Sequence, residues 1–112
     1  MCIFCKLASG EIPTEVIYED EDIFVFKDQD PKAPVHMLLI PKKHISSLNE
    51  INQANSSLVS KIFEKIPELA KEYGFNDSGY RVVSNCGLDG GQSVDHIHFH
   101  LMAKRKMEWP AG

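Results

Sequence analysis

The sequence predicts an α+β fold with about five mainly antiparallel strands, one long helix and a short N-terminal helix. Short apolar, β-compatible segments alternate with turn residues, and one central segment has the 3.6-residue periodicity of an amphipathic helix. The order along the chain is helix, strands, long helix, strands, which is typical of α+β proteins. The 112 residues, 43% of them hydrophobic, predict a single domain over residues 1–112.

The first half of the chain predicts a short helix and three strands, at residues 3–9, 14–18, 23–27 and 35–40. Gly10 closes the helix, and the acidic turn at residues 19–22 joins the first two strands as a hairpin. Two prolines make residues 30–34 a loop, and Pro41 ends the third strand.

The second half begins with a predicted helix over residues 55–73, where apolar side chains recur on one side, and Gly74 is a natural stop. Pro67 lies inside this segment. An interior proline removes a hydrogen bond and costs about 3 kcal/mol, so we expect a kink or break near residues 63–67. A glycine-rich loop then separates the last two predicted strands, in the order 80–84, 87–91 and 94–103.

Composition and charge exclude several classes of protein. A formal net charge of −4 is unlike the basic surface of a nucleic-acid scaffold, so no nucleic-acid partner is expected. No apolar run approaches the roughly 20 residues of a membrane span, and the first residues lack the pattern of a signal peptide. We therefore expect a cytoplasmic protein without a membrane partner.

The three cysteines require separate interpretations. Cys2 and Cys5 have the C-x-x-C spacing, whereas Cys86 stands alone. A disulfide is not expected in a reducing cytosol, so the pair indicates a metal site, a redox motif or coincidence. The redox interpretation is disfavoured because such motifs follow a strand, for which the sequence before Cys2 leaves no room. Cys86 is most simply a small buried apolar residue.

Three histidines alternate with apolar residues near the C-terminus. On a strand over residues 94–103, His96, His98 and His100 share one face, and the residues between them point into the core. The pattern is compatible with metal binding or with nucleophilic and acid–base chemistry at phosphorus or carbon. The outer imidazoles of a strand lie roughly 13 Å apart, so at most part of the run binds one metal and its centre is available for catalysis.

The glycine-rich segment at residues 87–93 runs directly into the histidines. Its backbone N–H groups, including those of Gly91 and Gln92, predict a phosphate-binding loop. Ser93 lies at the junction, where its hydroxyl is able to donate a hydrogen bond to a leaving group.

The run His96-Ile97-His98-Phe99-His100-Leu101-Met102 resembles the signature of the histidine triad superfamily, and the chain is most similar to its nucleotide-binding branch. Supporting segments extend over almost the whole chain: Ile12-Pro13, Asp28, Ala33-Pro34-Val35-His36, residues 40–45, residues 90–94 and Trp109-Pro110-Ala111-Gly112. Two positions depart from the usual pattern, because Asp95 replaces an aromatic residue and Ala103-Lys104 replaces a glycine pair.

The resemblance implies a role for each matching residue. His98 would be the nucleophile that takes the nucleoside monophosphate, flanked by His96 and His100, with His44 as a fourth pocket histidine. The remaining nucleotide contacts would divide among phosphate or leaving group (Asn85, Gly91, Gln92, Ser93), ribose (Asp28) and purine (Ile3, Phe4, Leu7, Phe26). The resemblance also implies a two-fold homodimer with one continuous sheet, in which the C-terminal tail carrying Trp109 reaches the partner's site.

Several bacterial proteins that this chain resembles bind zinc with a cysteine pair and two histidines. The matching residues here are Cys2, Cys5, His44 and His96, two thiolates and two imidazoles of the kind that form tetrahedral structural zinc sites. The alternative is that the two cysteines only pack the first helix. Zinc would be structural, because His98 needs no metal to react.

The resemblance implies a nucleotide-binding hydrolase or transferase acting on purine nucleoside 5′-phosphoramidates or related conjugates through a nucleotidyl-histidine intermediate. Alternatives are a dinucleoside polyphosphate hydrolase, a non-catalytic nucleotide-binding regulatory module, and a protein with structural zinc only.

Overall fold

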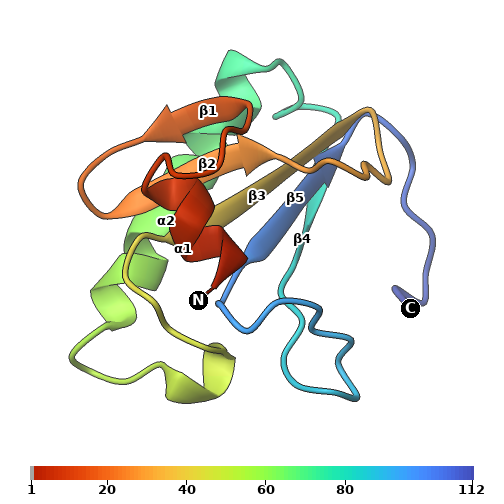
Figure 1. The fold of residues 1–112 in the computed structure, drawn as a ribbon. Coiled ribbons are helices and arrows are strands. Elements are labelled where there is room, and N and C mark those ends of the chain that lie inside the picture. The colour runs from red at the N-terminus through yellow and green to blue at the C-terminus, as the bar shows by residue number, and fades with distance from the viewer. Residues whose placement is uncertain (1) are drawn as a thin grey trace.

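The computed structural model describes residues 2–112 and contains one five-stranded sheet in the order β1-β2-β3-β5-β4, with all neighbouring strands antiparallel (Figure 1). Two helices and one short 3-10 turn complete the fold. The elements are α1 (Ile3–Ala8), β1 (Val16–Glu19), β2 (Ile23–Lys27), β3 (Val35–Pro41), η1 (Leu48–Glu50), α2 (Ser56–Glu72), β4 (Tyr80–Val83) and β5 (Phe99–Ala103). The predicted α+β class is confirmed.

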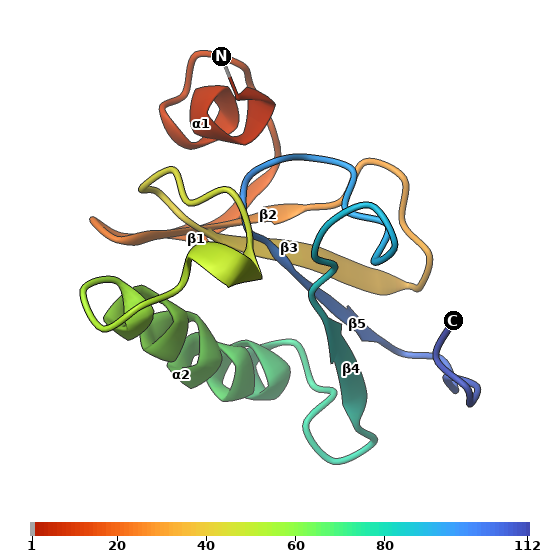
Figure 2. The ribbon, with the colours of Figure 1, turned by 90° about the horizontal axis from the view of Figure 1, so that it is seen from below.

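The sheet lies between the two helices, with α2 on one face and α1 on the other (Figure 2). The larger core forms where α2 packs its apolar side, including Ile62 and Leu69, against the sheet. The smaller core forms where Phe4 and Leu7 of α1 pack against the opposite face. Burying both faces explains why β2 and β3 are apolar almost throughout.

Strand register determines which polar side chains share the α1 face. β5 pairs with β3 so that His100 lies opposite Leu38, and Met102 lies opposite His36. Since side chains alternate along a strand, His36 and His100 occupy the same face as Leu38, which packs with α1. The insertion of β5 between β3 and β4 therefore brings these two histidines together.

Helix α2 runs without interruption through Pro67, so the break expected there is not found. Pro67 is exposed, and the neighbouring turns bury Ile62, Ile66 and Leu69 against the sheet, which offsets the lost hydrogen bond. At its N-terminal end, the buried Asn55 side chain accepts from the backbone of Asn52 and donates to that of Glu50. No helix described within residues 2–112 has the length and apolar character to cross a membrane.

The last strand is shorter than predicted, because residues 94–98 lie outside the sheet. The Ile97 N–H donates to the carbonyl of Ile45 in the loop after β3, at 2.7 Å, and the His96 N–H donates to the carbonyl of Val94. His96 and His98 consequently sit on irregular backbone, and the expectation that all three histidines line one strand face is wrong. The first predicted strand is displaced in a smaller way, beginning at Val16 rather than residue 14.

Candidate active site

A cleft of about 410 Å³ opens on the α1 face of the sheet at the start of β5. One part of it is apolar, lined by Ile3, Phe4, Leu7, Ile12, Phe26, Leu38 and Val94, and the other is polar, lined by Asp28, Gln29, Ser93, His98 and His100. The fold thus gathers eight of the residues assigned to the site from sequence. A larger opening elsewhere, of about 570 Å³, lies among Lys104, Arg105 and Lys106, away from the histidines.

His98 is buried in the cleft and its proton is fixed by the backbone. Its Nδ1 lies 2.7 Å from the carbonyl oxygen of His96. A carbonyl only accepts hydrogen bonds, so Nδ1 carries the hydrogen of the neutral ring and Nε2 holds a free lone pair. The ring packs edge-on against Phe4 and His100, each with a centroid separation of 5.1 Å. His98 is therefore held in the tautomer that a nucleophilic imidazole requires.

His36 and His100 form a hydrogen-bonded pair beside His98. The Lys32 backbone N–H donates to Nδ1 of His36 at 2.9 Å, which places the hydrogen of neutral His36 on Nε2. That Nε2–H donates to Nδ1 of His100, also at 2.9 Å, so the hydrogen of His100 lies on Nε2. The Asp28 carboxylate lies 3.3 Å from Nε2 of His36 and 3.9 Å from Nδ1 of His100.

Burial controls the charge of this pair. Burial lowers the pKa of His100 to about 4, and the neighbouring His98 and His36 act in the same direction. Burial also lowers the pKa of His36, against the opposing effect of the Asp28 carboxylate. Both rings are therefore neutral at pH 7, as the hydrogen-bond chain from Lys32 requires.

His96 turns away from the cleft and joins a cluster of sulfur and nitrogen ligands. Its Nε2 donates to the carbonyl of Pro41 at 2.8 Å, which leaves the Nδ1 lone pair 3.4 Å from Sγ of Cys2 and 3.5 Å from Sγ of Cys5. Nδ1 of His44 lies 3.4 Å from Sγ of Cys5, and all four ligand atoms lie within 4.8 Å of one another.

This donor set fits a tetrahedral metal ion. With Zn–S bonds of about 2.3 Å and Zn–N bonds of about 2.0–2.1 Å, sulfur and nitrogen ligands lie about 3.5 Å apart. Burial, reinforced by the hydrogen bond and charge of Cys2, raises the pKa of the Cys5 thiol, so this thiol does not readily lose its proton without a nearby cation. The Pro41 carbonyl supplies the partner that a metal-bound imidazole usually has on its second nitrogen.

Two histidines differ in part from the roles that the resemblance implied. His44, implied both as a pocket histidine and as a zinc ligand, lies with Cys5 and His96 and does not line the cleft. His36, which was not assigned a role, contacts His100 instead. The spacing of His36 from Leu38 shows that the two side chains share a face of the predicted strand. Only the pairing between β3 and β5 shows that His100 lies on that face as well.

The glycine-rich loop is held by Gln92, whose side chain points into the protein. Its Oε1 accepts from the Gly87 N–H, and its Nε2 donates to the carbonyls of Ser46 and Val94. A Cβ on Gly90 would lie 2.3 Å from the carbonyl oxygen of Cys86, so this turn requires glycine. Gln92 thus shapes the loop, and neither it nor Asn85 or Gly91 lines the cleft.

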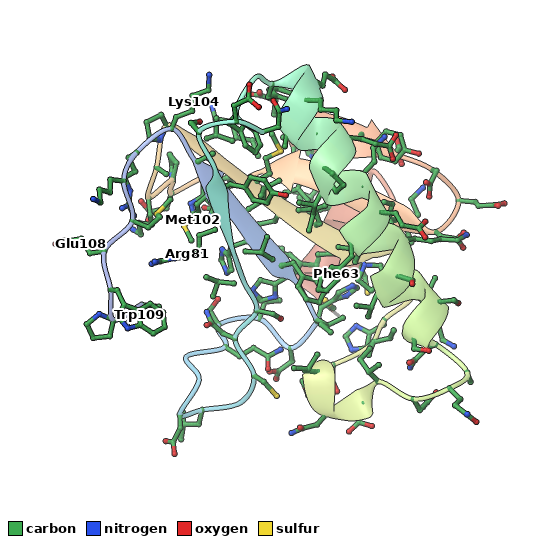
Figure 3. All side chains as sticks on the ribbon, turned by 180° about the vertical axis from the view of Figure 1, so that it is seen from behind. Phe63, Arg81, Met102, Lys104, Glu108 and Trp109 are labelled. Carbon is green, nitrogen blue, oxygen red and sulfur yellow. The ribbon has the colours of Figure 1, made fainter. Side chains whose placement is uncertain are left out.

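Trp109 lies on the tail beyond β5, 84% exposed and away from the cleft of its own chain (Figure 3). The tail is attached to the sheet by Arg81 on β4, whose Nη2 donates to the carbonyl of Glu108. Within residues 2–112 the indole therefore makes no contribution to the histidine site of the same chain.

The fold and the arrangement of its histidines place the chain in a family. A profile described as "Scavenger mRNA decapping enzyme C-term binding" matches residues 1–110. Protein HitA of Neisseria gonorrhoeae is 46% identical over 101 residues, which are 90% of this chain and 94% of that protein. The chain belongs to the histidine triad (HIT) family.

Solved structures extend the likeness to the whole fold. A HIT family hydrolase from Legionella pneumophila is 47% identical with a TM-score of 0.97, and each chain is covered completely. A histidine triad protein from Clostridium difficile is 48% identical with a TM-score of 0.93, covering 96% of this chain and 93% of that one. A histidine triad nucleotide-binding protein from Candida albicans is 36% identical with a TM-score of 0.80, covering 100% and 85%.

Proposed function

We propose that this protein is a nucleotide-binding hydrolase that cleaves purine nucleoside 5′-phosphoramidates or related conjugates through a nucleotidyl intermediate on His98. The observation that carries the proposal is the buried His98 ring, whose Nδ1–H is fixed on the His96 carbonyl and whose Nε2 is left free in the cleft. The names of similar proteins, a HIT family hydrolase and a histidine triad nucleotide-binding protein, support hydrolysis and nucleotide binding, the two coarser parts of the proposal.

In the first step, Nε2 of His98 attacks phosphorus and the P–N bond breaks. The departing nitrogen takes one proton, which the exposed Ser93 hydroxyl at the cleft relays from water. The nucleotidyl-imidazolium that forms keeps its Nδ1–H on the His96 carbonyl, which stabilises the positive charge. In the second step, water attacks phosphorus, loses a proton and releases neutral His98 with the nucleoside monophosphate.

His100 serves the phosphate rather than the proton transfer. Because its Nδ1 accepts from His36, its Nε2–H is available to donate to a phosphate oxygen. A pKa of about 4 keeps this ring neutral at pH 7, so it donates a hydrogen bond without protonating His98 or its leaving group. Charge on the phosphate in the transition state is thus met by a donor already in place.

The two parts of the cleft match the two parts of a purine nucleoside. The apolar wall formed by Ile3, Phe4 and Phe26 accommodates a flat base, and the Asp28 carboxylate on the polar side can accept hydrogen bonds from ribose hydroxyls. We propose in addition that Cys2, Cys5, His44 and His96 hold one structural zinc ion per chain, on the fit of the donor atoms given above.

Intact-protein mass spectrometry tests the assignment of His98. Wild-type protein mixed with a slowly hydrolysed adenosine 5′-phosphoramidate should gain one adenosine monophosphate per chain, and His98→Ala should gain none and lose turnover by roughly a thousandfold or more. The matched control is Asp95→Asn, an exposed neighbour outside the cleft, which should behave as wild type.

Three results would contradict the proposal. An adduct on His98→Ala would place the nucleophile elsewhere, and faster cleavage of a dinucleoside polyphosphate than of the phosphoramidate would favour that alternative class. Tight nucleotide binding with neither adduct nor turnover would indicate a regulatory binding module.

A further inference from the structure

Helix α1 takes part in both the metal cluster and the cleft. Its N-cap residue Cys2 and its residue Cys5 provide the two sulfur ligands. Ile3 and Phe4, between the two cysteines, and Leu7, two residues after Cys5, line the apolar wall of the cleft. A six-residue helix is far too short to be stable alone, so its position depends on what it is anchored to.

His96 forms a second connection between the same two places. Its Nδ1 belongs to the metal cluster, and its backbone carbonyl accepts the Nδ1–H of His98. One buried residue thus contributes a ligand to the cluster and orients the ring that faces the cleft.

Phe4 joins the two connections. Its ring packs edge-on against His96 with centroids 6.0 Å apart, against His98 at 5.1 Å, and against Phe26 at 5.5 Å. Any shift of α1 therefore moves the surface on which the His98 ring rests, as well as the wall of the cleft.

We propose that metal binding at the cluster and purine nucleotide binding in the cleft are thermodynamically coupled through α1, with Cys5 and His96 as positioning residues for the nucleotide. The proposal rests on the nucleotide and zinc sites proposed above. Without the ion, α1 is held mainly by the apolar packing of Phe4 and Leu7, and part of the nucleotide's binding free energy is used to order it. The coupling is reciprocal, so nucleotide must tighten zinc binding by the same factor that zinc tightens nucleotide binding.

The test measures both halves of the cycle at equilibrium, without turnover. Adenosine monophosphate is titrated by calorimetry into zinc-loaded protein and into protein stripped with a chelator. Zinc affinity is measured by competition with a chromophoric chelator, with and without saturating adenosine monophosphate. We expect both affinities to change by the same factor, about tenfold, which lies within the usual range of allosteric coupling.

Two variants provide the controls. Cys5→Ser should bind adenosine monophosphate with the weak affinity of the stripped protein, whereas Cys86→Ser, a cysteine outside the cluster, should behave as wild type. Phe4→Ala keeps all four ligands but removes the ring that contacts both sites, so its coupling factor should fall towards one.

The outcomes separate the proposals from one another. Failure of zinc-loaded protein to bind adenosine monophosphate would overturn the proposed function, and failure to bind zinc would overturn the metal site and the coupling with it. Equal nucleotide affinity with and without zinc, with the function intact, would overturn the coupling alone. A factor that stays unchanged in Phe4→Ala would overturn the part given to the Phe4 ring in transmitting the coupling.

Discussion

At the scale of single residues, main-chain groups decide which nitrogen of each histidine is free. The Pro41 carbonyl accepts a hydrogen bond from Nε2–H of His96, and the His96 carbonyl accepts one from Nδ1–H of His98. The Lys32 N–H donates to Nδ1 of His36. Imidazoles that look equivalent in the sequence therefore face their sites with different atoms. His96 presents Nδ1 to the cluster of cysteine sulfurs, whereas His98 presents Nε2 to the cleft.

Burial of His36 and His100 makes the protein's stability depend on pH. Both pKa values are lowered on folding, that of His100 from 6.5 to about 4, so the unfolded chain binds protons that the folded chain excludes. The contribution of these neutral histidines to the free energy of unfolding is fully present above about pH 6.5 and is lost as the pH falls towards 4. Urea unfolding at pH 7 and at pH 4.5, with chelator present so that metal release does not contribute, should show a lower free energy of unfolding at pH 4.5.

His100→Asn is the matched variant for this measurement. It removes the titrating group at an unchanged position on β5 and should reduce the difference in unfolding free energy between the two pH values. An equal pH dependence in the variant and in wild type would show that His100 is not the group responsible.

At the scale of elements, hydrophobic patterning was sufficient wherever local sequence and packing agree. The predicted strand at residues 23–27 and the helix at residues 55–73 match β2 and α2 to within a residue, because alternation and 3.6-residue periodicity reflect burial directly. The alternation of residues 94–98 predicts a strand, but these residues lie outside the sheet, where the Ile97 N–H donates to the Ile45 carbonyl instead of to a neighbouring strand. That contact joins segments some 50 residues apart, and no local pattern reports it.

The site likewise divides into features that local sequence predicts and features that depend on contacts with distant segments. The His98 position, the cleft wall on α1 and the cysteine–histidine ligand set were reached through a resemblance that matches motif residues. The role of His36 and the inward turn of the Gln92 side chain were not, because each depends on a partner from a distant segment, His100 and Ser46 respectively.

Pro67 offers a prediction about α2. The helix continues through this exposed proline although it provides no N–H for the preceding turn. Pro67→Ala should therefore raise the free energy of unfolding by about 1–2 kcal/mol, the gain of roughly 3 kcal/mol in helix propensity being reduced by greater chain entropy in the unfolded state. Thermal and urea unfolding measure the change, with Glu64→Ala, an exposed position one turn earlier, as the control. A loss of stability in Pro67→Ala would contradict this account.

At the scale of the whole molecule, β4 leaves one edge of the sheet without a neighbour within residues 2–112. Tyr80 and Val82 of this strand are substantially exposed, and they pair with Ala103 and Leu101, whose side chains lie on the α2 face of the sheet. Phe63 of α2, labelled in Figure 3, is also exposed. An open edge beside apolar side chains is the kind of surface that a second copy covers in a two-fold arrangement. We therefore expect a homodimer whose two sheets meet at β4.

Sedimentation equilibrium should give a mass near twice 12.6 kDa at micromolar concentration. Val82→Lys places a charge on this edge and should shift the protein to the mass of one chain. Leu88→Lys adds the same charge at a loop residue that is 95% exposed and should leave the dimer intact. A wild-type monomer, or dissociation by both variants alike, would exclude β4 as the interface.

The central place of β5 has a consequence for synthesis. β5 is the last strand to be made, yet it lies between β3 and β4 and carries His100. While the chain is being translated, β3, apolar except for His36, has one edge open until residues 99–103 emerge. Incomplete chains therefore lack His100 of the candidate site and display the unpaired edge of an apolar strand, a feature prone to aggregation between neighbouring nascent chains.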